Sequence, residues 1–503
     1  MSFKRNVIAS YVSQIYTAAI GIVMLPFYIK YMGAEAYGMI GFFTMLQAWF
    51  ALLDLGLTPT IGRETARFNA GALDAISFRQ LYRALSCIFI GVAISGATLL
   101  LWQASNIAAH WLNVKVLPMG EVVVALKIIA VCVSLRWLGG LYRGVITGFE
   151  KLVWLSGFNL IIGTFRFVIV IPVMSYFGYS IQVFFSYQLI VAICECVCLW
   201  LKSVTLLPRF SAVQNASIGW SFKPVRPILK FALSIAFTSS VWVLVTQTDK
   251  LVLSSILSLS DYGVYTLAVL VSSGIMIIGS PISTVLMPRM AHLYASGQKV
   301  EVIALYKSST QLVSVIAGAA AITLILCAHE LLTVWTGDVE IAQKAAPILQ
   351  LYAIGNGLLA IGAFPYYLQY ARGELFYHLL GNALMVVLII PCIILAAKSY
   401  GGIGAGVVWC AMNAIYLFCW VAYVHIKLVP GVHIRWLAGD VLRIIVPALF
   451  AGLLVAYLFP PSTDAIMNFV KIFSVGCAAL VTAVLASPFV RAIISTKMMG
   501  VKA

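Results

Sequence analysis

Predominantly apolar residues form long runs along this chain of 503 residues, for example from Leu233 to Leu257 and from Leu379 to Ala397. A strand of a membrane barrel would instead alternate apolar and polar positions over about ten residues. A helix needs roughly 20 apolar residues to cross about 30 Å of hydrocarbon. Runs of this length therefore predict membrane-spanning helices.

The breaks between these runs predict about fourteen transmembrane helices. We expect them near residues 7–30, 36–62, 82–102, 121–143, 153–175, 182–202, 228–257, 263–290, 309–329, 344–371, 375–397, 404–427, 442–459 and 468–487. Inside hydrocarbon the backbone must satisfy its own hydrogen bonds, and helices do this within one segment. The predicted fold class is an all-α membrane protein.

Three short motifs recur in the same order in the two halves of the chain. They are Ala36-Tyr37-Gly38 and Asp261-Tyr262-Gly263, the segments 63–71 and 289–297, and Tyr176-Phe177-Gly178 and Ser399-Tyr400-Gly401. The first two pairs are 225 and 226 residues apart. The repeat predicts two pseudo-symmetric six-helix lobes in the same orientation, with two C-terminal helices added. Parallel repeats of this kind typically enclose a central site and rock against each other.

The repeat also suggests where the domains begin and end. The N-terminal six-helix lobe is predicted at 1–205, a cytoplasmic linker at 206–227 and the C-terminal lobe at 228–427. The last two helices and a cytoplasmic tail are predicted at 428–503.

Composition and charge support the membrane assignment. The chain is 62% hydrophobic and 10% charged, whereas soluble proteins are roughly 45–50% apolar and about 25% charged. With the N-terminus in the cytoplasm, 23 of the 32 Lys and Arg residues fall in loops or tails on the cytoplasmic side and 4 on the other. This is the positive-inside distribution. It predicts that both termini are cytoplasmic, and it explains the net charge of +16 without nucleic-acid binding.

Several motifs then resemble a known family. They are the run from Leu25-Pro26 to Tyr37-Gly38, Leu53-Asp54-Leu55-Gly56-Leu57, Thr248-Asp249-Lys250, Tyr262-Gly263-Val264-Tyr265, the stretch from Pro281 to Pro288-Arg289, and Tyr400-Gly401-Gly402-Ile403-Gly404-Ala405. This ordered set resembles the polysaccharide transporters, the Wzx-type flippases of the MOP exporter superfamily. The resemblance spans at least the first twelve helices.

The resemblance implies that the protein moves an undecaprenyl-diphosphate-linked oligosaccharide from the cytoplasmic to the periplasmic leaflet of the bacterial inner membrane. The glycan would serve O-antigen of lipopolysaccharide, capsule or another envelope polysaccharide. The resemblance also implies a two-lobed fold with alternating access, and a polymerase and a chain-length regulator of the same pathway as partners. Neither a cofactor nor a metal site is expected.

Ionisable residues inside the predicted helices are costly in lipid and are therefore candidates for function. Arg166, near the middle of the fifth helix, could pair bidentately with a phosphate. Alternatively it forms an internal ion pair with Glu195. Arg136 could receive the substrate on entry, or it could extend to the cytoplasmic interface.

Two further groups of charged residues are candidates for gating. Asp249 and Lys250 are adjacent, so their side chains are expected to diverge by about 100°. One of them would face the cavity, for gating or substrate contact, and the other a neighbouring helix. Asp54 is expected to pair with Arg63 or Arg289, either as a cytoplasmic latch that breaks on rocking or as a static structural pair.

Buried carboxylates and prolines supply the remaining candidates. Glu195 and Asp54 could bind a coupling proton, because burial favours the protonated form of a carboxylate. Pro281 and Pro288 could act as hinges in the eighth helix, although a purely structural kink is the more common role of a proline.

Three other functions remain open. A multidrug or cation antiporter of the same superfamily would usually have twelve helices. A peptidoglycan lipid-precursor flippase would suit fourteen helices equally well, but we expect more arginine in its first helices. A polymerase or ligase would need a sizeable periplasmic loop, and the external loops predicted at 103–120 and 330–343 are short. The sequence therefore favours a transporter over an enzyme.

Overall fold

The computed structural model describes residues 3–208, 225–460, 462 and 464–498. The chain divides into two compact units, Met1–Gly263 and Val264–Ala503. Most of the predicted linker at 206–227 lies outside the described residues. The predicted division at that linker stays a prediction. In the structure the boundary between the two units falls later in the chain, and α10 belongs to the first unit.

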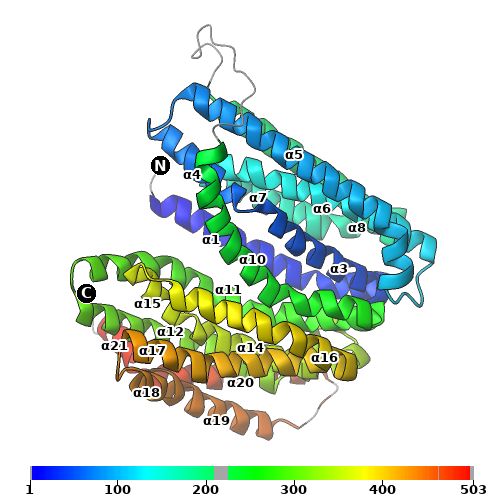
Figure 1. Ribbon diagram of the computed structural model, residues 1–503. Helices are drawn as coiled ribbons and strands as arrows, with labels where there is room; N and C mark the ends of the chain where they lie inside the picture. The colour runs from blue at the N-terminus through cyan, green and yellow to red at the C-terminus, as the bar shows by residue number, and fades with distance from the viewer. Residues whose placement is uncertain (1–2, 209–224, 461, 463, 499–503) are drawn as a thin grey trace. The chain divides into compact units, whose positions relative to one another are not determined.

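Helices make up nearly all of the described chain (Figure 1). In the first unit they are α1 (Phe3–Val23), α2 (Leu25–Met32), α3 (Ala34–Phe50), α4 (Leu57–Asn69), α5 (Ala75–Asn106), α6 (Met119–Gly148), α7 (Leu152–Thr164), α8 (Val170–Phe177), α9 (Ile181–Leu206) and α10 (Arg226–Ile256). The next helix, α11 (Leu259–Ala295), begins in the first unit and continues into the second. The second unit continues with α12 (Lys299–Leu326), α13 (Ala328–Thr336), α14 (Val339–Gly362), α15 (Phe364–Arg372), α16 (Phe376–Ile415), α17 (Val421–Leu428), α18 (His433–Trp436), α19 (Arg443–Leu458), α20 (Ala465–Ala486) and α21 (Pro488–Met498).

The predicted all-helical membrane fold is confirmed. Twelve segments of the described chain are long and apolar enough to cross a membrane. One of them, Phe376–Leu428, has 53 residues and contains two helices, because Gly401 within it has the non-helical angles φ 56° and ψ −136°. The break matches the predicted gap between 397 and 404. The protein is thus a multi-pass membrane protein, and the count of about fourteen helices stays a prediction.

The second predicted helix, 36–62, is wrong as a single element. It is α3, a 3₁₀ turn η1 (Ala51–Asp54) and α4, separated by Leu55 and Gly56 in the left-handed region, with φ 46° and 71°. A Cβ on Gly56 would also collide with the carbonyl oxygen of Ala232, so the backbone of α10 approaches closely at this turn. The break places the carboxylate of Asp54 at the start of α4.

Helix ends support the internal repeat. Gly71 follows α4 and Gly297 follows α11, and both have positive φ, 78° and 77°. In each case the N–H of the next residue donates to the carbonyl five positions earlier, at 2.9 and 3.0 Å. This is the geometry of a Schellman cap, for which glycine is favoured. Equivalent motifs therefore end equivalent helices in the two halves.

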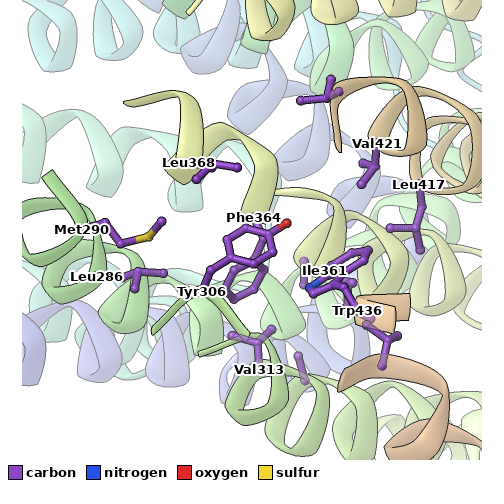
Figure 2. Packing of buried hydrophobic residues seen from close by; sticks show 14 of the residues in the cluster. Leu286, Met290, Tyr306, Val313, Ile361, Phe364, Leu368, Leu417, Val421 and Trp436 are labelled. Carbon is purple, nitrogen blue, oxygen red and sulfur yellow. The ribbon is translucent and has the colours of Figure 1, made fainter. Parts of the chain in front are cut away.

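The second unit has a large apolar core. Figure 2 shows Tyr306 and Phe364 at its centre, with Met290 on one side and Trp436 on the other. The rings of Tyr306 and Phe364 meet edge to face with centroids 5.8 Å apart. A second cluster consists of buried residues from α12, α19 and α20. The two helices after the repeat therefore pack on α12.

In the first unit, α6 packs against α4 through glycines with little space around them. A Cβ added at Gly148 would lie 2.5 Å from the Cβ of Thr65 and against the carbonyl oxygen of Gly62. We expect Gly148→Ala to destabilise the unit by about 1–3 kcal/mol, because overpacking displaces neighbouring backbone. Thermal unfolding in detergent measures this. Gly91→Ala in α5 is the control, since its added Cβ meets no atom within 4 Å, and an equal effect of both substitutions would contradict the prediction.

Candidate functional site

Arg166 lies on a π-helical turn, η3 (Phe165–Ile169), between α7 and α8. The wider turn disturbs the helical hydrogen-bond ladder. Tyr187, Gln188 and Tyr28 donate side-chain hydrogen bonds of 2.9, 2.9 and 2.6 Å to the carbonyls of three successive residues of this turn. Turns of this kind frequently occur at functional sites. Residues of α2 and α9 thus fix the backbone that carries Arg166.

Glu195 of α9 pairs with two arginines. Its carboxylate lies 2.5 Å from the Arg166 guanidinium and 2.5 Å from that of Arg143. Arg143 also donates a 2.6 Å hydrogen bond to Asn159, and Glu195 itself is 5% exposed. The ion pair of Arg166 with Glu195, which the sequence left as the alternative to a phosphate contact, is therefore present. The predicted helix 121–143 ends at Arg143, but α6 continues to Gly148, so Arg143 lies within the helix and reaches Glu195.

Arg136, two helical turns before Arg143 on α6, contacts neutral groups. It donates to the side-chain oxygens of Gln188 at 2.7 Å and Gln47 at 3.3 Å, and its guanidinium lies 4.8 Å from the centre of the Phe43 ring. None of the ion pairs found in residues 3–208 and 225–498 includes Arg136. Its positive charge is therefore not neutralised by a direct carboxylate partner.

Together these residues form a cluster with excess positive charge. Arg143 and Arg166 contact Glu195 directly. Arg136 is connected to Arg166 through Gln188, which accepts from Arg136 and donates to the Arg166 carbonyl. Three guanidinium groups and one carboxylate sum to +2. If Asp54, which lines a cavity together with Arg136, is included, the sum is +1.

Two cavities of the first unit expose this cluster. The cavity that we call the α7 cavity has a volume of about 430 Å³ and lies between α1, α6, α7 and α9. Its polar lining consists of Ser13, Gln14, Thr17, Arg143, Asn159, Arg166 and Glu195. The α4 cavity has a volume of about 420 Å³, and its polar lining consists of Gln47, Asp54, Thr58, Arg136, Trp137, Ser239 and Ser240. The sequence predicted Arg136, Arg166, Glu195 and Asp54 as candidates, and the fold places Arg166 and Glu195 on the wall of one cavity and Arg136 and Asp54 on the wall of the other.

Asp54 caps the start of α4. Its carboxylate accepts hydrogen bonds of 3.2 Å from the Thr58 N–H and one of 2.5 Å from the Thr58 hydroxyl. This local role was not expected from the sequence. A latch between Asp54 and Arg63 or Arg289 stays a prediction.

Asp249 and Lys250 lie in α10. The ends of their side chains were expected to point apart, but they lie close together. The Lys250 Nζ is 3.6 Å from the Asp249 carboxylate and donates a 2.7 Å hydrogen bond to the carbonyl of Thr246. The four-carbon side chain of lysine is long enough to bend back along its own helix. Asp249 is 2% exposed, so the pair is mainly internal, and a role in gating stays a prediction.

Pro281 and Pro288 both lie within α11, which is helical from Leu259 to Ala295. The continuous helix shows that neither proline ends it. Their proposed role as hinges is not tested by this structure and stays a prediction.

Comparison with known protein families shows to which family the chain belongs. A family model described as "Polysaccharide biosynthesis protein" matches residues 3–294, more than half of the chain. The chain belongs to this family. No curated protein matches its sequence.

Solved structures show which fold this chain has. It is similar to the lipid II flippase MurJ in an inward closed conformation, with a TM-score of 0.74 and 14% identity over 97% of this chain and 100% of that one. An inward-facing MATE multidrug transporter of the MOP superfamily gives a TM-score of 0.64 and 10% identity over 82% and 94%. A MOP transporter from Pyrococcus furiosus gives 0.57 and 12% over 84% and 94%. The chain therefore has the fold of MOP-superfamily transporters, as its motifs predicted.

Proposed function

We propose that this polysaccharide biosynthesis protein is a flippase. It moves undecaprenyl-diphosphate-linked oligosaccharide repeat units from the cytoplasmic to the periplasmic leaflet of the bacterial inner membrane by alternating access, with both termini in the cytoplasm. The product serves O-antigen or another envelope polysaccharide. The function is transport without covalent chemistry.

The observation that carries the proposal is the excess of arginine around Glu195. A charge in the hydrocarbon region is costly unless it is paired. Three arginines near one carboxylate leave positive charge that a bound anion would neutralise. A diphosphate bears about two negative charges, and guanidinium groups bind its oxygens bidentately.

The α7 cavity suggests how the anion is received. Arg166 and Arg143 both donate to Glu195. A diphosphate that enters the cavity can accept from other N–H groups of each guanidinium while the contacts to the carboxylate remain. The neutral side chains of Ser13, Thr17 and Asn159 line the same cavity and supply further hydrogen-bonding groups. In the part of the chain that is described, Arg166 Nε lies buried without a hydrogen-bond partner.

The same charge argues against a cation antiporter. An organic cation would be repelled by a site with a net charge of +1 or +2, and its binding would require further acidic residues. A peptidoglycan lipid-precursor flippase is a closer alternative. The structural likeness to the lipid II flippase MurJ is the observation that favours this alternative.

Deletion of the gene distinguishes these functions. We expect loss of surface polysaccharide and accumulation of lipid-linked repeat units that remain accessible only from the cytoplasmic side. Normal glycans combined with new sensitivity to cationic drugs would instead identify an exporter. Normal glycans combined with cell lysis and accumulation of peptidoglycan precursors would identify the alternative flippase.

A further inference from the structure

The α4 cavity differs from the α7 cavity in its chemistry. It contains one acidic and one basic side chain, Asp54 and Arg136, which sum to zero charge. The other polar groups on its wall are neutral: Gln47, Thr58, Ser239 and Ser240 provide amide and hydroxyl groups. The cavity is therefore poorly suited to a second diphosphate.

This combination of groups suits the hydroxyl groups of a sugar. A carboxylate accepts hydrogen bonds from hydroxyls, a guanidinium donates to them, and amide and hydroxyl side chains do both. The Asp54 oxygens accept from Thr58 on one side, and the lone pairs that remain can accept from a ligand, because a carboxylate offers about four acceptor sites. Arg136 is held by Gln188 and Gln47, which fixes the direction of its donors.

Trp137 is the aromatic side chain on the wall of this cavity. It is 9% exposed and lines the cavity, and one face of its ring stacks on Phe89 with centroids 4.6 Å apart. Among the described residues, neither its Nε1–H nor the Nε–H of Arg136 has a hydrogen-bond partner. A buried donor without a partner costs free energy, so a ligand that brings an oxygen to either donor would be favoured.

From these observations we propose that the α4 cavity binds uncharged sugar residues of the head group, next to the diphosphate in the α7 cavity. Asp54, Arg136 and Trp137 are its recognition residues. A chain of hydrogen bonds connects the walls of the two cavities through Gln188, which accepts from Arg136 and donates to the carbonyl of Arg166. This inference rests on the proposed function and assigns the part of the substrate that each cavity recognises.

Binding of two lipids to the purified full-length protein in nanodiscs tests the assignment. One probe is the lipid-linked repeat unit extracted from a strain that lacks its polymerase, and the other is undecaprenyl diphosphate without sugar. We expect Asp54→Asn to weaken binding of the repeat unit about 10- to 100-fold, because a charge-assisted hydrogen bond is lost, and to leave the sugar-free lipid unchanged. Arg166→Gln should weaken binding of both lipids.

Asp74→Asn is the matched control. Asp74 caps α5 by accepting from the Ser77 N–H at 2.9 Å, as Asp54 caps α4, but it is exposed and lies outside both cavities. Asparagine caps a helix about as well as aspartate, so both variants should fold and Asp74→Asn should bind both lipids normally. If Asp54→Asn fails to fold, Trp137→Phe decides, because it keeps an aromatic ring against Phe89 and removes the indole N–H and part of the ring surface. Its expected effect is a several-fold loss for the repeat unit alone.

Equal weakening of both lipids by Asp54→Asn, or no weakening of either, would overturn the assignment of the α4 cavity. These outcomes differ from a failure of the proposed function. In that case the wild-type protein itself would bind neither lipid.

Discussion

Replacement of Glu195 by Gln is expected to cause the largest loss of stability of any single substitution in the site. The change leaves Arg143 and Arg166, both within 2.5 Å of the same carboxylate, without a shared counter-charge and close enough to repel each other. Breaking a buried ion pair by removing one partner costs up to about 3–5 kcal/mol. We expect less protein in the membrane and a lower unfolding temperature in detergent.

Two variants show whether charge is the cause. Glu340→Gln breaks an exposed pair with Lys344 and should have almost no effect, because exposed pairs contribute little. Adding Arg143→Gln to Glu195→Gln should restore part of the lost stability, since it removes the repulsion between the two arginines. A Glu195→Gln protein as stable as the wild type would contradict the account of the cluster.

Replacement of Arg166 by Gln is expected to reduce polysaccharide export strongly while the protein remains folded. Glu195 keeps Arg143 as its partner, so the carboxylate is not left alone. The diphosphate loses its bidentate contact, and we expect export to fall at least about tenfold. Surface polysaccharide and lipid-linked intermediates in the complemented deletion strain measure this.

Arg166→Lys keeps the charge without the planar fork and should restore export only in part. Arg435→Gln is the control, because Arg435 is exposed on α18 and the same change there should leave export normal. Full export by the Arg166→Gln variant would remove Arg166 from the site.

The helical membrane fold could be predicted because it depends on local patterns. Apolar runs longer than about 20 residues leave few alternatives in a bilayer. The gap around Gly401 was visible in the sequence, and the Gly71 and Gly297 motifs marked equivalent helix ends before the structure showed their caps. Each of these signals lies within a few residues of the feature that it predicts.

The break between α3 and α4 left a signal that the apolar pattern obscured. Gly56 followed by Thr58-Pro59 is typical of a helix start, where proline is tolerated because the first N–H groups have no helical partner. The surrounding residues remain apolar enough for one continuous helix. The sequence therefore predicted Asp54 only as part of an ion pair, and its role as the cap of α4 became visible in the structure.

The arginine cluster could be predicted only in part. Arg166 and Glu195 were recognisable because charges are rare in the middle of apolar runs. Arg143 ended the predicted helix 121–143, since a charge near the end of an apolar run usually marks the membrane boundary. Gln188 and Asn159 carry no charge, and only the π-helical turn and the packing of α6, α7 and α9 show that they contact the arginines.

Reconstituted transport tests the central claim, that a buried positive cluster carries an anionic lipid. Purified wild-type protein is placed in liposomes that contain lipid-linked repeat units, and the fraction that crosses to the opposite leaflet is followed over time. We expect movement faster than in protein-free liposomes, inhibited by excess undecaprenyl diphosphate and unaffected by an organic cation such as ethidium. Movement of ethidium that undecaprenyl diphosphate does not inhibit, with no movement of the repeat unit, would contradict the account.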